Sequence, residues 1–188
     1  MDGEAERTGR GVHYCAHCDG GFYKGKTVAV IGGGNSAVED ALYLSHLAEK
    51  VYLVHRRDVL TATKIYTDAL QRTSNIEFLP NRTVSELLYK EQFEGLVLQN
   101  RQTGETESLN CNAVFVSIGR NPATELVKDA IDLDAGGYIK ADESTKTNLP
   151  GVFAVGDIRT KALRQVVTAA ADGAVAVHFA EEYLAKAF

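Results

Sequence analysis

Two cysteines near the start of the chain, Cys15 and Cys18, have the spacing Cys-x-x-Cys and are followed directly by Asp19. A pair with this spacing can cycle between a disulfide and two thiols, and one of its thiolates is often activated. Asp19 could move protons during thiol–disulfide exchange; the alternative is a turn residue before Gly20 and Gly21. The segment therefore predicts a redox-active dithiol.

Two other interpretations of the cysteine pair stay open. Residues 13–18, His-Tyr-Cys-Ala-His-Cys, have the residue types of a zinc cluster. A closed zinc site usually takes two ligand pairs that are well separated in sequence, and no second pair of this kind follows farther along the chain. The two cysteines could also be buried and inert. We favour the redox dithiol and expect no metal site. Cys111, in a predicted strand, is more ordinary as a packing residue than as a reactive one.

A glycine-rich turn follows the cysteines and has the pattern Gly-x-Gly-x-x-Ala. It lies between an apolar run at residues 28–31 and a helical pattern at residues 36–46, which is the context that a dinucleotide site requires. Glycines let the backbone approach a pyrophosphate, and the helix N-terminus offers free N–H groups to it. The alternative is an ordinary tight turn. We assign to the dinucleotide site Gly32, Gly34, Asn35, Ser36 and Ala37.

The end of the second predicted strand, residues 51–54, indicates which dinucleotide binds. An NAD site usually has an acidic residue here that holds the ribose 2′-hydroxyl, whereas this chain has His55, Arg56 and Arg57. Two guanidinium groups suit a 2′-phosphate, because arginine makes paired, charge-assisted bonds to phosphate oxygens. A solvated basic loop is the alternative. The sequence favours NADPH over NADH.

The elements that would position these residues follow from hydrophobic periodicity and turn signals. The runs at 28–31, 36–46 and 51–54 predict a β-α-β unit, and a helix at 63–72 and a strand at 76–79 follow it. Residues 83–89, 93–100 and 105–110 predict an antiparallel meander. Further predictions are strands at 113–117 and 152–155 and a helix at 163–185. The pattern indicates an α/β fold with a Rossmann-like domain.

Composition and charge exclude several classes of protein. The chain has 188 residues, of which 45% are hydrophobic and 24% are charged, and a net charge of −5. This balance leaves no general basic surface for a nucleic acid. The most apolar late stretch, residues 166–180, is too short to span a bilayer. No secretory signal opens the chain, and three cysteines make no even disulfide framework. We expect a cytoplasmic protein without membrane or nucleic-acid partners.

Taken together, the motifs resemble those of the low-molecular-weight thioredoxin reductases. The segment CAHCDG resembles their redox centre, GGGNSA their NADPH turn and HRRD their 2′-phosphate site. The segments GVFAVGD and RQVVTAAADG resemble their flavin-binding half-motifs. The resemblance covers the chain from about Gly11 onward.

The resemblance implies a path for electrons from NADPH through FAD to a Cys15–Cys18 disulfide and then to thioredoxin. Cys18 would be the sulfur nearer the isoalloxazine, Cys15 would attack the substrate disulfide, and Asp19 would donate a proton. Members of the family rotate one domain against the other between two poses, and they are usually homodimers. The residues implied in FAD binding are Gly156, Asp157, Arg164, Gln165 and Val166.

The same resemblance implies a domain division, with a disordered or hinge segment at 1–10, an NADPH-binding domain carrying the redox cysteines at 11–119, and the C-terminal portion of a FAD-binding domain at 120–188. The family's FAD domain has a first half ahead of the redox cysteines, with its own phosphate turn, and this sequence has no second turn of that kind. We expect the chain alone to bind NADPH weakly and FAD poorly, and not to reduce thioredoxin. Thr61 also stands where the family commonly has a third arginine, with Lys64 nearby.

Three rival functions remain. A flavoprotein that reduces a peroxiredoxin with NADH has a similar Cys-Pro-His-Cys segment; His17 fits that pattern, but Ala16 is not proline, and the arginine pair argues against NADH. A ferredoxin-dependent thioredoxin reductase lacks the nucleotide motifs found here. A non-catalytic module that binds NADPH would use the β-α-β unit alone, and replacing Cys15 would then change nothing measurable.

Overall fold

The structure of the protein is a computed structural model that describes residues 3–187. The chain divides into two compact units, Met1–Gly119 and Arg120–Phe188. Each unit is described by itself. Residues 3–10 form hydrogen-bonded turns without a helix or strand.

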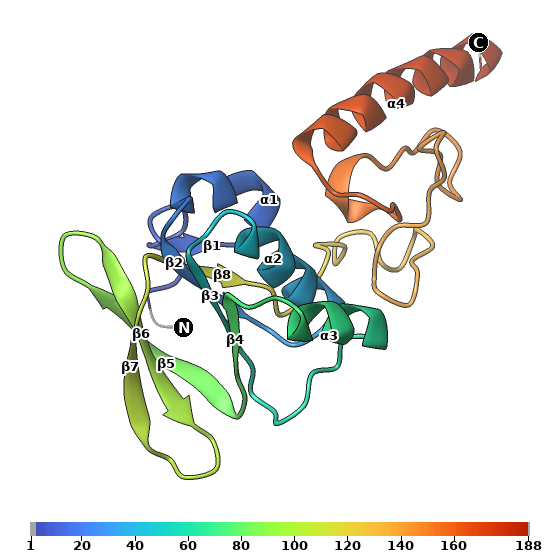
Figure 1. Ribbon diagram of the computed structural model, residues 1–188. Coiled ribbons are helices and arrows are strands. Elements are labelled where there is room, and N and C mark those ends of the chain that lie inside the picture. Colours follow the sequence, from blue (N-terminus) through green and yellow to red (C-terminus); the bar gives the residue numbers. More distant parts are fainter. Residues whose placement is uncertain (1–2, 188) are drawn as a thin grey trace. The chain divides into compact units, whose positions relative to one another are not determined.

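The described part of the first unit, residues 3–119, contains two sheets, three α-helices and one 3₁₀-helix (Figure 1). In chain order the elements are β1 Val12–His13, α1 Ala16–Asp19, η1 Gly20–Tyr23, β2 Thr27–Ile31, α2 Asn35–Ser45, β3 Lys50–Val54, α3 Lys64–Gln71, β4 Ile76–Leu79, β5 Arg82–Tyr89, β6 Phe93–Asn100, β7 Thr106–Asn110 and β8 Ala113–Val116.

The central sheet has five parallel strands in the order β1-β8-β2-β3-β4. Its inner strands are apolar and rich in β-branched residues, as expected of strands that are covered on both faces. Alternate side chains serve opposite faces: in β2, Val28 and Val30 join one core cluster and Ala29 joins the other.

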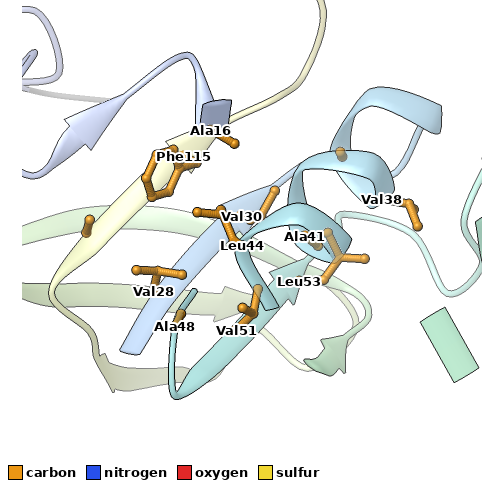
Figure 2. Close-up of a cluster of buried hydrophobic side chains, with 12 residues drawn as sticks. Ala16, Val28, Val30, Val38, Ala41, Leu44, Ala48, Val51, Leu53 and Phe115 are labelled. Atoms are coloured by element: carbon orange, nitrogen blue, oxygen red, sulfur yellow. The ribbon is translucent and has the colours of Figure 1, made fainter. Parts of the chain in front are cut away.

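Each face of the parallel sheet is covered by a different layer (Figure 1). On one face α2 buries Ala37, Val38, Ala41 and Leu44, which recur at helical spacing, against Phe115 and the valines of β2 (Figure 2). On the other face the three-stranded antiparallel sheet β5-β6-β7 contributes its own apolar residues to the second cluster, among them Phe93, Leu96 and Leu98.

Most predicted elements of this unit are confirmed to within one or two residues, and the meander is confirmed as the sheet β5-β6-β7. The exceptions are β1, α1 and η1, which the sequence analysis did not predict; β1 has two residues and is too short for a periodic signal. Its pairing with β8, Val12 opposite Val114, extends the sheet by one strand directly before the cysteines.

The second unit is less regular. It contains η2 Gly156–Ile158, the long helix α4 Val166–Ala187, and a small core that includes Ile131, Ile139 and Ala154. The predicted strand at residues 152–155 is wrong, because Phe153 makes only one isolated bridge, to Lys146. An apolar run forms a strand only where a neighbouring strand accepts its backbone hydrogen bonds, and the described part of this unit has isolated bridges in place of a sheet. No helix in residues 3–187 is both long and apolar enough to cross a membrane.

Candidate redox disulfide and dinucleotide cavity

Cys15 and Cys18 form a disulfide within a single helical turn. Cys15 is the N-cap of α1, and its Sγ accepts a hydrogen bond from the backbone N–H of Cys18 at 3.1 Å. The backbone N–H of Asp19 donates to the Cys15 carbonyl at 3.1 Å. The three residues predicted to carry out the redox chemistry are therefore brought together in one turn at the carboxyl end of β1.

This turn packs tightly on α2. Ala16 is buried in the same cluster as Leu44, and the ring of His17 stacks on Tyr43 with the ring centroids 4.1 Å apart. A Cβ at Gly20 would lie 2.8 Å from the Leu44 side chain. Small residues at both ends of α1 thus allow its backbone to approach the helix closely.

Asp19 has a buried partner, His13. Their atoms Oδ2 and Nδ1 lie 2.8 Å apart, and His13 Nε2 lies 2.7 Å from the Tyr23 hydroxyl. Burial raises the pKa of Tyr23, with Tyr89 and Asp19 adding to the effect, so its hydroxyl keeps its proton at neutral pH. With the Tyr23 hydroxyl donating to Nε2, Nδ1 carries the ring proton and donates to Asp19 Oδ2. Sequence reasoning counted His13 only within the zinc alternative, and here both of its ring nitrogens have protein partners.

A cavity of about 610 Å³ lies where parallel strands β2, β3 and β8 end, and Ile31, Val54 and Val116 contribute to its wall. Ligands of open α/β sheets bind at this edge, next to the point where the strand order reverses. Most of the residues predicted to bind the dinucleotide line this one cavity: Gly32, Gly34, Asn35, Ser36, His55, Arg56 and Arg57.

Ala37 is not part of the lining; it packs behind the turn. A Cβ at Gly32, where φ is 151°, would stand 2.4 Å from the Ser117 carbonyl oxygen and 2.6 Å from the Ala37 Cβ. Gly32 and Ala37 therefore set the close approach of α2 to the sheet. The first turn of α2 has no capping side chain, because its N-cap is Gly34. Its backbone N–H groups remain available to an anion.

Two residues that shape this turn were not predicted. At Gly33 a Cβ would overlap the ring of His55, at 2.3 Å. Thr61 donates to the Gly33 carbonyl oxygen from both its backbone N–H, at 2.8 Å, and its hydroxyl, at 3.1 Å. The run of three glycines was the available signal for Gly33, whereas nothing in the local sequence announced the role of Thr61. The Asn35 side chain accepts from the Thr63 backbone N–H at 2.8 Å, which ties the turn to the start of α3.

The basic triplet divides into one buried and two exposed residues. His55 is 8% exposed, and its Nε2 has no hydrogen-bond partner within residues 3–187. Burial lowers the His55 pKa, and the charges of Arg57 and Arg56 lower it further. The two guanidinium groups are exposed at the cavity wall. An unpartnered imidazole nitrogen beside two arginines and a glycine cradle fits a phosphorylated dinucleotide.

In the second unit, Gly156 and Asp157 form the turn of η2, and Asp157 is exposed. Arg164 donates from Nε to the Asp157 carbonyl oxygen at 3.3 Å and lies over the ring of Tyr138. The other two residues implied in FAD binding stand at the start of α4, where the Gln165 backbone N–H donates to the Thr168 hydroxyl and Val166 is 86% exposed. All five lie in this turn or in the segment that leads into α4.

A buried charge cluster supports the η2 turn. Asp172 binds Arg159 through both carboxylate oxygens, at 2.6 and 2.9 Å, and Lys161 at 2.6 Å. It also accepts the Gly156 backbone N–H at 2.8 Å. The bonds from Arg159 hold the Asp172 pKa well below its usual range, and those from Lys161 and Gly156 contribute. Sequence reasoning saw no role for these charges, because their partners lie on different segments.

A family model of the pyridine nucleotide-disulphide oxidoreductases matches residues 1–173. The chain belongs to this family. It is 45% identical over 192 residues to the thioredoxin reductase of Peptoclostridium acidaminophilum, a match that covers 99% of this chain and 61% of the relative. It is 44% identical over 187 residues to a bifunctional thioredoxin reductase/thioredoxin of Mycobacterium leprae (strain TN), covering 99% of this chain and 41% of that protein.

Among solved structures, the thioredoxin reductase from Streptococcus pyogenes MGAS5005 matches with a TM-score of 0.93 and 41% identity, over 98% of this chain and 60% of that chain. The expected resemblance to thioredoxin reductases and the α/β fold class are therefore confirmed. The chain spans about 60% of the length of the first of these relatives and of this structure.

Proposed function

We propose that this chain carries the nicotinamide site and the redox centre of a thioredoxin-disulfide reductase. Electrons would pass from NADPH by way of FAD to the Cys15–Cys18 disulfide and then to thioredoxin. The observation that carries the proposal is the presence, in one unit, of this disulfide and of a cavity lined by a glycine turn and two arginines. In this proposal residues 11–119 are the NADPH-binding domain and residues 120–188 are part of a FAD-binding domain, with residues 1–10 as a hinge segment.

NADPH would bind along the cavity of the first unit. The pyrophosphate would lie against Gly34 and the backbone N–H groups of Asn35 and Ser36, since these open α2 without a capping side chain. Arg56 and Arg57 would bind the 2′-phosphate, with His55 Nε2 as a third polar group at the same wall. Arginine in place of an acidic residue supports NADPH over NADH.

FAD would be held in part by the η2 turn and the start of α4. Gly156 and Asp157 would hold the ribityl chain, and Arg164, Gln165 and Val166 would lie along the ring. The exposure of Asp157 and Val166 leaves them accessible to a ligand. When bound, FAD supplies the acceptor for the hydride of NADPH and passes two electrons to the disulfide.

The exchange with thioredoxin would use both thiols of the reduced pair. The Cys15 thiolate would attack a sulfur of the substrate disulfide, forming a mixed disulfide and releasing one substrate thiolate. Cys18 would then attack Cys15 and release the second thiolate. The chain's two thiols become a disulfide while the substrate disulfide becomes two thiols, and Asp19 would carry protons from the former to the latter.

The proposal is tested with the reduced chain and oxidised thioredoxin. With the Cys15–Cys18 pair reduced chemically beforehand, a step that needs neither NADPH nor FAD, we expect thioredoxin to gain two thiols in a single turnover, counted by mass spectrometry after alkylation. With NADPH as the only reductant, the chain alone is still expected not to reduce thioredoxin. The Cys18→Ser variant should accumulate a mixed disulfide through Cys15. A module that only binds NADPH would transfer nothing, and that result would overturn the proposal. The resemblance to thioredoxin reductases also supports a homodimer for the whole enzyme, and the cysteine content supports a cytoplasmic location.

A further inference from the structure

We propose that His13 is a positioning residue for the dithiol chemistry: its Nδ1–H fixes the Asp19 carboxylate, and Tyr23 in turn fixes His13. The inference rests on the proposed thiol–disulfide exchange and adds to it the group that orients the proton donor.

The imidazole of His13 is held on several sides. Its side chain is 4% exposed, and it bonds Asp19 and Tyr23 through its two nitrogens, at 2.8 and 2.7 Å. It stacks on Phe115 of β8 with the ring centroids 5.2 Å apart, and the Tyr23 ring meets its edge at the same separation. A ring fixed by packing and by two hydrogen bonds presents Nδ1–H in one direction.

The Asp19 carboxyl stands at the boundary between this buried ring and solvent. Its side chain is 35% exposed, and Oδ2 is the oxygen held by His13. The backbone of Asp19 is bonded to Cys15 in the same turn as the disulfide. One carboxylate oxygen is thus anchored, while the side chain keeps access to solvent. An anchored donor loses less orientational freedom on reaching the transition state than a free one.

The proton matters when the leaving sulfur is basic. As Cys15 forms its bond to one substrate sulfur, the other sulfur departs with the electron pair of the broken S–S bond. An alkyl thiolate departs more easily if Asp19 passes it a proton that the carboxylate has taken from a thiol of the reduced pair, whereas an aromatic thiolate with a low pKa leaves unaided. A group that orients the proton donor therefore changes the rate with alkyl disulfides and not with aromatic ones.

A purely structural role is the alternative, because a buried imidazole needs hydrogen-bond partners in any case. Two substitutions separate the roles. His13→Asn keeps a side-chain N–H that can reach Asp19, and His13→Leu keeps the bulk without a donor. Asp19→Asn removes the proton donor itself.

The experiment measures the rate at which each reduced chain opens two disulfides, bis(2-hydroxyethyl) disulfide and 5,5′-dithiobis(2-nitrobenzoate). We expect His13→Leu to be about tenfold slower than the parent chain with the alkyl disulfide and within about twofold with the aromatic one. His13→Asn should stay within about threefold of the parent with both. The double variant His13→Leu/Asp19→Asn should be no slower than Asp19→Asn alone, because His13 acts on the rate only through the Asp19 carboxyl.

The inference is overturned if His13→Leu slows the opening of both disulfides equally or of neither, or if His13→Asn is as slow as His13→Leu. It is also overturned if the effects of His13→Leu and Asp19→Asn on the rate add in the double variant. A parent chain that opens neither disulfide would overturn the dithiol exchange as well, which separates failure of the proposed function from failure of this inference alone.

Discussion

The ring of His55 occupies the space that a side chain at Gly33 would need: a Cβ there would lie 2.3 Å from His55 Cε1 and Nδ1. The second glycine of the triplet is thus required by packing inside the protein. Gly34 has no such neighbour, since the nearest atom to its Cβ position is Thr61 Oγ1, at 3.9 Å. Adjacent glycines therefore have separable roles.

Gly33→Ala should destabilise the chain without any ligand, by about 1–3 kcal/mol, because the ring of His55 must shift to admit the methyl group. Gly34→Ala should change the free energy of unfolding by less than about 0.5 kcal/mol. Its backbone, with φ at −87°, already accepts an ordinary residue. Urea unfolding followed by circular dichroism measures both. An equal loss of unfolding free energy in Gly33→Ala and Gly34→Ala would contradict the separate roles of the two glycines.

Replacing Arg56 and Arg57 together by alanine should weaken NADPH binding by about 10–100-fold, the loss expected for one or more hydrogen bonds to a charged group. NADH lacks the 2′-phosphate, so its affinity should change by less than about threefold. Calorimetric titration of the chain with each nucleotide gives the two ratios. Arg72→Ala combined with Arg101→Ala removes two exposed arginines outside the cavity lining and is the control for net charge. A double variant that weakens both nucleotides alike would speak against a 2′-phosphate site.

Asp172→Asn should destabilise the second unit by about 3–5 kcal/mol, because it leaves Arg159 buried without its carboxylate. Glu143→Gln is the matched control: Glu143 lies 3.9 Å from the same guanidinium, but it is 98% exposed. Hydrogen exchange of the α4 amides reports on this unit separately. Comparable exchange in both variants would show that burial of the Arg159–Asp172 pair is not what stabilises the turn.

The same carboxyl makes the second unit sensitive to acid. The Asp172 pKa is lowered in the folded chain, so its contribution to stability is fully present above the unfolded value of about 4 and is lost as the pH falls from there toward the lower folded value. Protection of the α4 amides should decline through this acidic range in the parent chain. In Asp172→Asn the decline should be shallower, and an unchanged slope would refute the assignment.

Cys111 lies in the connection between β7 and β8 and not, as predicted, in a strand. It should be inert in the folded chain, because burial raises its pKa to about 12. In a variant with Cys15→Ser and Cys18→Ser, iodoacetamide at pH 8 should modify Cys111 more than about 100-fold more slowly than an exposed cysteine. Mass spectrometry after timed quenching measures the rate, and addition of denaturant should restore ordinary reactivity. Rapid alkylation under native conditions would contradict the packing role that the sequence analysis favoured.

The β-α-β unit could be predicted because its signals are local. The apolar runs, the spacing of Gly32, Gly34 and Ala37, and the arginines after β3 all lie within one continuous stretch. The contacts that complete the sites are not local. His13 bonds to Asp19 and Tyr23, and Thr61 donates to the Gly33 carbonyl oxygen. Asp172 bonds to Arg159, which lies on a different segment, and the sequence around Asp172 gives no sign of this partner.

The prediction of a strand at residues 152–155 was wrong for the same reason, because strand formation also depends on a non-local partner. Its residues have strand-like character, but pairing depends on whether another strand arrives beside it, and Phe153 meets only Lys146. Periodicity reports which side chains prefer burial; it carries no information about the partner that must supply the hydrogen bonds.

Because Gly20 packs closely against Leu44 and Ala16 is buried, the turn that carries the disulfide cannot move independently of α2. The two sulfurs therefore cannot change position as the end of a flexible loop would while α2 keeps its place. For the sulfurs to reach a different reaction partner, the disulfide turn, α2 and the nucleotide cavity must move together as one rigid body.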